Sequence, residues 1–109
     1  MSNWIGVDLD GTLAYYDQWH GVEHIGAPIP VMMERVRMWL SEGKEVRIFT
    51  ARVQFDGAVQ PILDWLEAND LPPLTITNVK DSWMHELWDD RAVQVERNTG
   101  KILTCPSPS

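Results

Sequence analysis

Two aspartates that directly follow an apolar run are the residues of this chain best suited to chemistry. Ile5-Gly6-Val7 leads into Asp8-Leu9-Asp10-Gly11-Thr12, which places two carboxylates two positions apart. Residues two apart in an extended segment point to the same face, and like charges held that close are usually offset by a divalent cation. One carboxylate could attack phosphorus while the other transfers protons. Taken alone, the segment also fits an ordinary surface turn, because Asp-Gly is a common turn dipeptide.

Three further segments end in residues suited to the same chemistry. The segment 46–49, rich in β-branched and aromatic residues, is followed by Thr50-Ala51-Arg52. The predicted strand 74–79 is followed by Lys80, and Leu87-Trp88 leads into Asp89-Asp90. In open α/β sheets, ligands bind just beyond the carboxyl ends of the strands. Lysine and a threonine hydroxyl can stabilise charge on transferring phosphoryl oxygens, and magnesium prefers oxygen ligands. The sequence therefore favours one shared site for these side chains.

The elements that must position these residues alternate along the chain. Alternating strands and helices predict an α/β fold with a mostly parallel sheet and helices on both faces. Asn98-Thr99-Gly100, between 92–95 and 101–104, is typical of a C-terminal β-hairpin. The predicted strands cover about 4–9, 46–50 and 74–79 and a fourth that ends at 87–90; the predicted helices cover about 30–43 and 59–66, with a short helical turn over 82–86.

Length and composition predict one domain over residues 1–105 and a disordered tail over 106–109. The formal net charge of −7 argues against a broad surface for nucleic acid or anionic membrane. No apolar run is long enough to span a membrane, and no signal peptide is visible. Cys105 is the single cysteine and has no obvious base beside it, so neither an internal disulfide nor a catalytic thiol is expected. These features favour a cytoplasmic location.

The four motifs, in this order, resemble those of the haloacid dehalogenase superfamily over about residues 4–96. The resemblance implies a three-layer α/β/α Rossmann-like fold. It implies Asp8 as nucleophile and Asp10 as general acid and base, with Thr50 and Lys80 as further catalytic groups. It also implies Mg²⁺ held by Asp8, by the backbone carbonyl of Asp10 and by one residue of the pair Asp89-Asp90, unranked. An aspartate at position 10 is typical of the phosphatases and phosphotransferases of this superfamily rather than of its dehalogenases.

A narrower likeness concerns Thr50-Ala51-Arg52 and Asp89-Asp90-Arg91. These segments are similar to the phosphatase domain of polynucleotide kinase-phosphatases and to small members encoded in phage and prophage genomes. The likeness implies that Arg52 grips phosphate, in a substrate-binding set that also includes Gly11, Thr12 and Ala51. A guanidinium can bind phosphate bidentately. The alternative, that Arg52 is exposed and caps its loop or pairs with Asp56, is about equally supported.

The connections between the motifs are too short for a cap domain. Residues 13–28 have room only for a flap or small hairpin, so the chain resembles a capless member with an open site. Such a site admits a large substrate or is closed by a second subunit, which makes a homo-oligomer an open alternative. Aromatic flap residues could stack on a base or sugar, although packing of the flap onto the domain is favoured. The flap side chains concerned are Tyr15, Tyr16, Trp19 and His20.

The resulting functional hypothesis is a Mg²⁺-dependent phosphomonoester hydrolase that forms an aspartyl-phosphate. Its substrate would be a phosphorylated small molecule or a phosphorylated macromolecule end, with nucleotides and nucleic-acid ends among the candidates. A catalytically idle phosphate-binding or metal-binding accessory module is the alternative, and a phosphotransferase is weaker because a cap is missing. His20 and His24 are four apart but lie in a glycine-containing loop, and His85 fits a packing or surface role.

Overall fold

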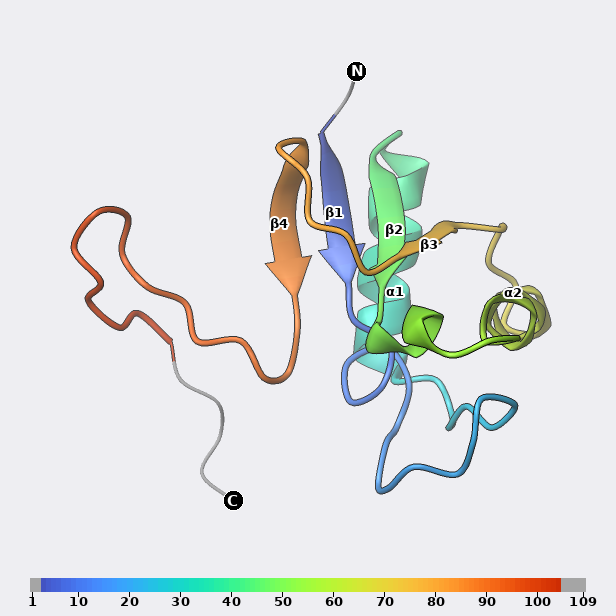
Figure 1. Ribbon diagram of the computed structural model, residues 1–109. Coiled ribbons are helices and arrows are strands. Elements are labelled where there is room, and N and C mark those ends of the chain that lie inside the picture. The colour runs from blue at the N-terminus through green and yellow to red at the C-terminus, as the bar shows by residue number, and fades with distance from the viewer. Residues whose placement is uncertain (1–2, 105–109) are drawn as a thin grey trace.

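A four-stranded, all-parallel sheet lies at the centre of the molecule (Figure 1), with strand order β3-β2-β1-β4. The computed structural model describes residues 3–104, so the predictions for Cys105 and the tail 106–109 fall outside the described residues. The α/β class and the parallel sheet expected from the sequence are confirmed. The strands are β1 (Trp4–Val7), β2 (Glu45–Phe49), β3 (Thr75–Thr77) and β4 (Met84–Trp88).

One face of the sheet packs against two helices that follow β1 and β2. α1 (Pro30–Ser41) starts at a proline, whose fixed φ suits the first turn, and ends before Gly43, which has a φ of +79°. α2 (Val59–Ala68) buries Ile62 and Leu66. A single apolar cluster joins the helices to β1 and to Val46 and Ile48, the alternate residues of β2 that are buried. The cluster includes Ile5, Val7, Met32, Met33, Val36, Trp39, Val46, Ile48, Ile62 and Leu66.

The other face of the sheet is covered by the extended connection 78–83. Figure 1 shows this segment crossing in front of β2 and β1, whereas α1 lies behind them. Trp4 Nε1 donates to Asp81 Oδ1 at 2.8 Å, and the Arg47 guanidinium lies 4.5 Å from the centre of the Trp4 ring. Arg47 also pairs with Asp81 at 3.6 Å. An arginine stacked on tryptophan therefore completes this layer where a helix would otherwise pack.

The predicted helical turn over 82–86 is wrong, because β4 already begins at Met84. Parallel pairing with β1 satisfies the backbone groups of this segment, and that long-range pairing overrides the local pattern. The register shifts by one residue at His85, so that Met84 faces Trp4 while Glu86 faces Ile5. This bulge brings Trp88 onto the core face of the sheet, where its ring lies 5.1 Å from that of Trp39.

Residues 13–28 form a flap with a short antiparallel base, and residues 3–104 contain no inserted cap domain. Ala14 bridges Pro28, and Tyr15 N donates to Ala27 O at 2.8 Å. Trp65 Nε1 on α2 donates to Gly26 O at 2.9 Å, which fastens the outer part of the flap to the helix. The described residues include no helix of the length and apolar character that a membrane crossing needs.

The predicted C-terminal hairpin is reduced to one isolated bridge, Val95 with Ile102. Glu96 N donates to Lys101 O, and Leu103 N donates to Gln94 O, both at 2.7 Å. We call residues 92–104 the arm. Figure 1 shows the arm extending away from the sheet beyond β4, and all of its residues are exposed.

Candidate active site

Three carboxylates meet at the carboxyl end of the sheet. Asp8 follows β1 and Asp89-Asp90 follows β4, and the two strand ends are neighbours, as the hydrogen bond from Asp8 N to Trp88 O at 2.9 Å shows. Each of the three side chains offers one oxygen, and these oxygens lie within 4.8 Å of one another. The order of the parallel strands therefore brings together residues that lie about eighty positions apart, and an all-oxygen donor set of this kind suits Mg²⁺.

The three carboxylates line an open hollow together with the residues that follow β2. Of the residues singled out in the sequence, Asp8, Asp10, Thr50, Ala51, Arg52, Asp89 and Asp90 all border it. Gly11 lies against the Asp90 carboxylate, and Thr12 Oγ1 donates to Asp8 Oδ2 at 3.3 Å. Four further lining residues were not singled out in the sequence as site residues. Phe49 is the last residue of β2, Gln54 and Phe55 belong to the turn after it, and Arg91 follows the acidic pair.

Asp8 is the electrostatic centre of the hollow. Burial raises the pKa of its carboxyl from 3.8 to about 8, and the hydrogen bond with Asp90 and the charges of Asp89 and Asp90 act in the same direction. The Thr12 hydroxyl opposes this shift but does not cancel it. Three carboxylates this close cannot all ionise without compensation. A divalent cation would supply that compensation, so the residues present fit a metal.

The raised pKa of Asp8 predicts an unusual pH dependence of stability. Because the folded-state pKa is about 8 and the unfolded value is 3.8, the folded protein binds more protons between these two values. The contribution of Asp8 to the stability of the metal-free protein should therefore be fully present below about pH 4 and be lost as the pH rises towards about 8. Thermal unfolding in a chelator at several pH values measures the effect. Asp8→Asn should lack this contribution, and an unchanged slope in that variant would contradict the assignment.

Gly11 is required by both its backbone and its neighbour. Its φ is +90°, a left-handed conformation that side chains disfavour, and a Cβ at this position would lie 2.5 Å from Asp90 Oδ2. The glycine therefore lets the loop after β1 pass directly against the acidic pair. This close approach explains why the two aspartates of the loop are followed by a residue without a side chain.

Gly11→Ala is expected to destabilise the fold by about 1–2 kcal/mol and to weaken Mg²⁺ binding, because the new methyl group displaces the Asp90 carboxylate. Urea unfolding and calorimetric titration with Mg²⁺ measure the two effects. Gly43→Ala is the matched control: its φ is +79°, but nothing lies within 4 Å of the added Cβ. It should lose similar stability and keep the affinity for Mg²⁺. Equal metal affinity in both variants would refute the role given to Gly11.

Asp10 and Arg52 form a bidentate ion pair in which Arg52 is buried and Asp10 is partly buried. Arg52 Nε donates to Asp10 Oδ2 at 2.7 Å and Nη2 donates to Oδ1 at 2.8 Å. The same guanidinium donates to the flap carbonyls of Val22 at 3.1 Å and His24 at 2.8 Å. Arg52 is only 4 % exposed. The alternative of an exposed arginine paired with Asp56 is therefore wrong, because Asp10 and the flap carbonyls take up its donors. A phosphate at Arg52 would compete with these partners.

Thr50 lies at the start of the turn η1 (Ala51–Gln54). Its Oγ1 accepts from Arg52 N at 3.1 Å, and its backbone N donates to Thr77 O on β3 at 2.9 Å. The residue is buried and borders the hollow. Lys80 differs: it is exposed, it does not border the hollow, and it belongs to the connection that crosses the sheet towards β4. The structure thus brings together the predicted site residues except Lys80.

Aromatic side chains form one rim of the hollow. The Trp19 ring lies 5.3 Å from that of Phe55 and 4.9 Å from the Arg52 guanidinium. Trp19 thus packs the flap onto the domain, as the favoured interpretation expects, although Trp19 and Tyr16 also border the hollow. His20 and His24 are exposed, with His20 3.2 Å from Asp17. They belong to the surface of the flap, as expected.

The comparisons with known proteins support the fold and go no further. No model of a known protein family matches the sequence, and no protein of curated function matches it. Among solved structures, the chain is similar to a conserved protein from Bacteroides thetaiotaomicron, with a TM-score of 0.61 and 20 % sequence identity. The match covers 95 % of this chain and 84 % of the other. At this identity, the likeness concerns the arrangement of helices and strands.

Proposed function

We propose that this chain is a Mg²⁺-dependent phosphomonoester hydrolase that acts through an aspartyl-phosphate on Asp8. The observation that carries the proposal is the meeting of Asp8 with Asp89 and Asp90 at one end of the sheet, within 4.8 Å. Asp10 borders the same hollow two residues further on. A nucleophile, a second carboxylate for proton transfer and an oxygen-rich cation site are the groups that this reaction class needs.

In the proposed reaction, a carboxylate oxygen of Asp8 forms a bond to phosphorus as the ester oxygen leaves. Asp10 must first leave its ion pair with Arg52 and bind a proton, which it gives to the leaving oxygen. It then takes a proton from the water that hydrolyses the acyl phosphate. Asp8 must be ionised to attack, and its pKa of about 8 in the absence of a cation holds it largely protonated at neutral pH. Activity should therefore require a cation that favours the charged form.

Mg²⁺ would be held by Asp8, by Asp89 or Asp90, and by the backbone carbonyl of Asp10. When bound, it neutralises charge on the carboxylates and on the phosphate oxygens. The Thr50 hydroxyl is buried at the edge of the hollow, where it could donate to a phosphoryl oxygen. Lys80 would have to approach from the connection between β3 and β4 to contribute, since it does not border the hollow.

A phosphomonoester panel assayed with and without Mg²⁺ tests this function. It should include nucleotides, sugar phosphates and oligonucleotides with 3′- or 5′-phosphates, because the hollow is open. Release of inorganic phosphate that depends on Mg²⁺ is expected for at least one of these classes. Binding of Mg²⁺ and phosphate without turnover of any substrate would favour the idle accessory module instead.

A further inference from the structure

The arm, residues 92–104, exposes an apolar face that has no counterpart on its own chain. Val93, Val95 and Ile102 are each about half exposed, and Val95 bridges Ile102 directly. Residues opposite each other in a bridge share one face, so Val95 and Ile102 lie together, and Val93 stands two positions before Val95. Within residues 3–104, no hydrogen bond or ion pair joins the arm to the rest of the chain.

The arm also differs in charge from the remainder of the chain. Residues 92–104 contain two basic side chains, Arg97 and Lys101, and one acidic side chain, Glu96. The remaining residues contain seven basic and fifteen acidic side chains, a net charge of −8. An apolar arm with a basic tip is therefore attached to a strongly acidic body, and such a pairing of opposite charges favours association between copies.

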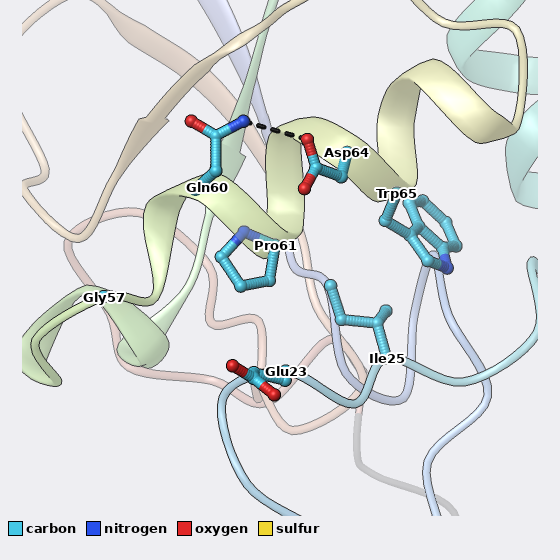
Figure 2. Close-up of a pocket in the computed structure, with 7 residues that line it drawn as sticks. All are labelled: Glu23, Ile25, Gly57, Gln60, Pro61, Asp64 and Trp65. Atoms are coloured by element: carbon cyan, nitrogen blue, oxygen red, sulfur yellow. Dashed lines mark hydrogen bonds between the residues drawn. The ribbon is translucent and has the colours of Figure 1, made fainter.

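The body carries a groove whose lining complements the arm. The groove lies between the flap and α2, with Ile25, Pro61 and Trp65 as apolar lining and Glu23 and Asp64 as its carboxylates. Figure 2 shows Ile25 and Pro61 side by side at the centre of the groove, with Glu23 below them. Gln60 Nε2 donates a hydrogen bond to Asp64 Oδ1. The groove thus combines an apolar floor with negative charge, whereas the arm combines an apolar face with positive charge.

The groove lies at the opposite side of the molecule from the arm. Figure 1 shows the arm leaving beyond β4, and α2 beyond the edge where β3 lies. We propose that the arm of one copy docks in the groove of a second copy, with its apolar face on Ile25, Pro61 and Trp65 and with Arg97 and Lys101 near Glu23 and Asp64. The contact joins unlike surfaces and is therefore heterologous. Repeated contacts of this kind form a closed ring or an open filament, depending on the rotation between neighbouring copies.

Docking at the groove would brace the flap from outside. Trp65 lines the groove and donates a hydrogen bond to Gly26 O in the flap. Glu23, which also lines the groove, lies between Val22 and His24, and the backbone carbonyls of these two residues accept hydrogen bonds from Arg52. An arm in the groove therefore contacts the segment that positions the Arg52–Asp10 pair. In a chain without a cap domain, the second copy would supply this support.

The test is sedimentation equilibrium of the full chain over micromolar to millimolar concentrations, with two reversed variants. The arm-reversed variant carries Arg97→Glu and Lys101→Glu, and the groove-reversed variant carries Glu23→Lys and Asp64→Lys. Wild-type protein should self-associate, and each variant should need a concentration at least about tenfold higher to reach the same degree of association. Val95→Asp should have the same effect by disrupting the apolar contact. Far-ultraviolet circular dichroism confirms that the variants remain folded.

Mixing the two reversed variants gives the decisive result. The acidic arm of the first then meets the basic groove of the second, and the native arm of the second meets the native groove of the first, so association should return. The control Glu34→Lys with Glu42→Lys changes two exposed acidic side chains outside the groove and should associate as wild type does. A monomeric wild type at all concentrations, or no recovery on mixing, would overturn the proposal. Neither outcome depends on the hydrolase activity.

Discussion

Replacement of Asp8 by asparagine is expected to lower Mg²⁺-dependent phosphomonoester hydrolysis by at least about 10³-fold. The amide has nearly the shape of the carboxyl group but cannot form the acyl phosphate. Because burial and two neighbouring carboxylates disfavour the ionised form of Asp8, its removal should not destabilise the metal-free protein above neutral pH. Initial rates on the best substrate of the panel, together with thermal unfolding, separate loss of chemistry from loss of fold.

Asp17→Asn provides the matched control for this prediction. Asp17 lies in the flap, is exposed and does not border the hollow, so its replacement should leave the rate unchanged. Retention of the full rate in Asp8→Asn would exclude Asp8 as the nucleophile. Equal losses in both variants would point to a general effect of charge near the site.

Arg52→Met should produce the largest loss of stability among single substitutions in the site. The change removes two hydrogen bonds to Asp10 and two to flap carbonyls, and leaves the Asp10 carboxylate, which is only 19 % exposed, without its partner. Breaking a buried ion pair from one side typically costs about 3–5 kcal/mol. Urea unfolding measures this cost. Hydrolysis should also decrease sharply, because both Asp10 and the flap lose their support.

The double variant Arg52→Met with Asp10→Asn shows whether the pair itself is responsible. Neutralising Asp10 removes the uncompensated carboxylate, so the double variant should be more stable than Arg52→Met alone. The stability of Arg52→Lys should lie between those of the wild type and Arg52→Met, because an ammonium group keeps the charge but loses the bidentate geometry. Additive losses in the double variant would mean that Arg52 stabilises the fold through the flap carbonyls and not through Asp10.

Much of the fold could be predicted because its local signals agree with its tertiary structure. The apolar spacing of Met32, Val36 and Trp39 predicts α1, and the apolar residues of β1 and β2 predict buried strands. The segment over 82–86 was predicted wrongly because its conformation depends on pairing with β1. No local sequence pattern indicates that pairing. The missing helix between β3 and β4 is likewise compensated by a distant contact, Arg47 on Trp4.

The acidic site could be anticipated to the extent that parallel strands all end at one edge of the sheet. That geometric rule predicts that Asp8, Thr50 and the pair Asp89-Asp90 meet, and the structure brings them to one hollow. The rule does not predict where a residue lies when it stands several positions beyond the end of a strand. Lys80 stands three positions after β3, where the chain has already turned across the sheet.

The sequence by itself determined the alternation of elements and the edge of the sheet at which the carboxylates gather. These follow from periodicity, strand direction and backbone geometry, which are local properties. Only the tertiary structure decided that Asp10 pairs with Arg52, that Asp90 lies against Gly11, and that Lys80 does not border the hollow. Such contacts join residues that are distant in the chain. The burial of these residues, the charges beside them and the space around them depend on how the strands, the flap and the connections pack. The two aspartates that follow β1 thereby come to differ: Asp8 faces other carboxylates, and Asp10 faces an arginine.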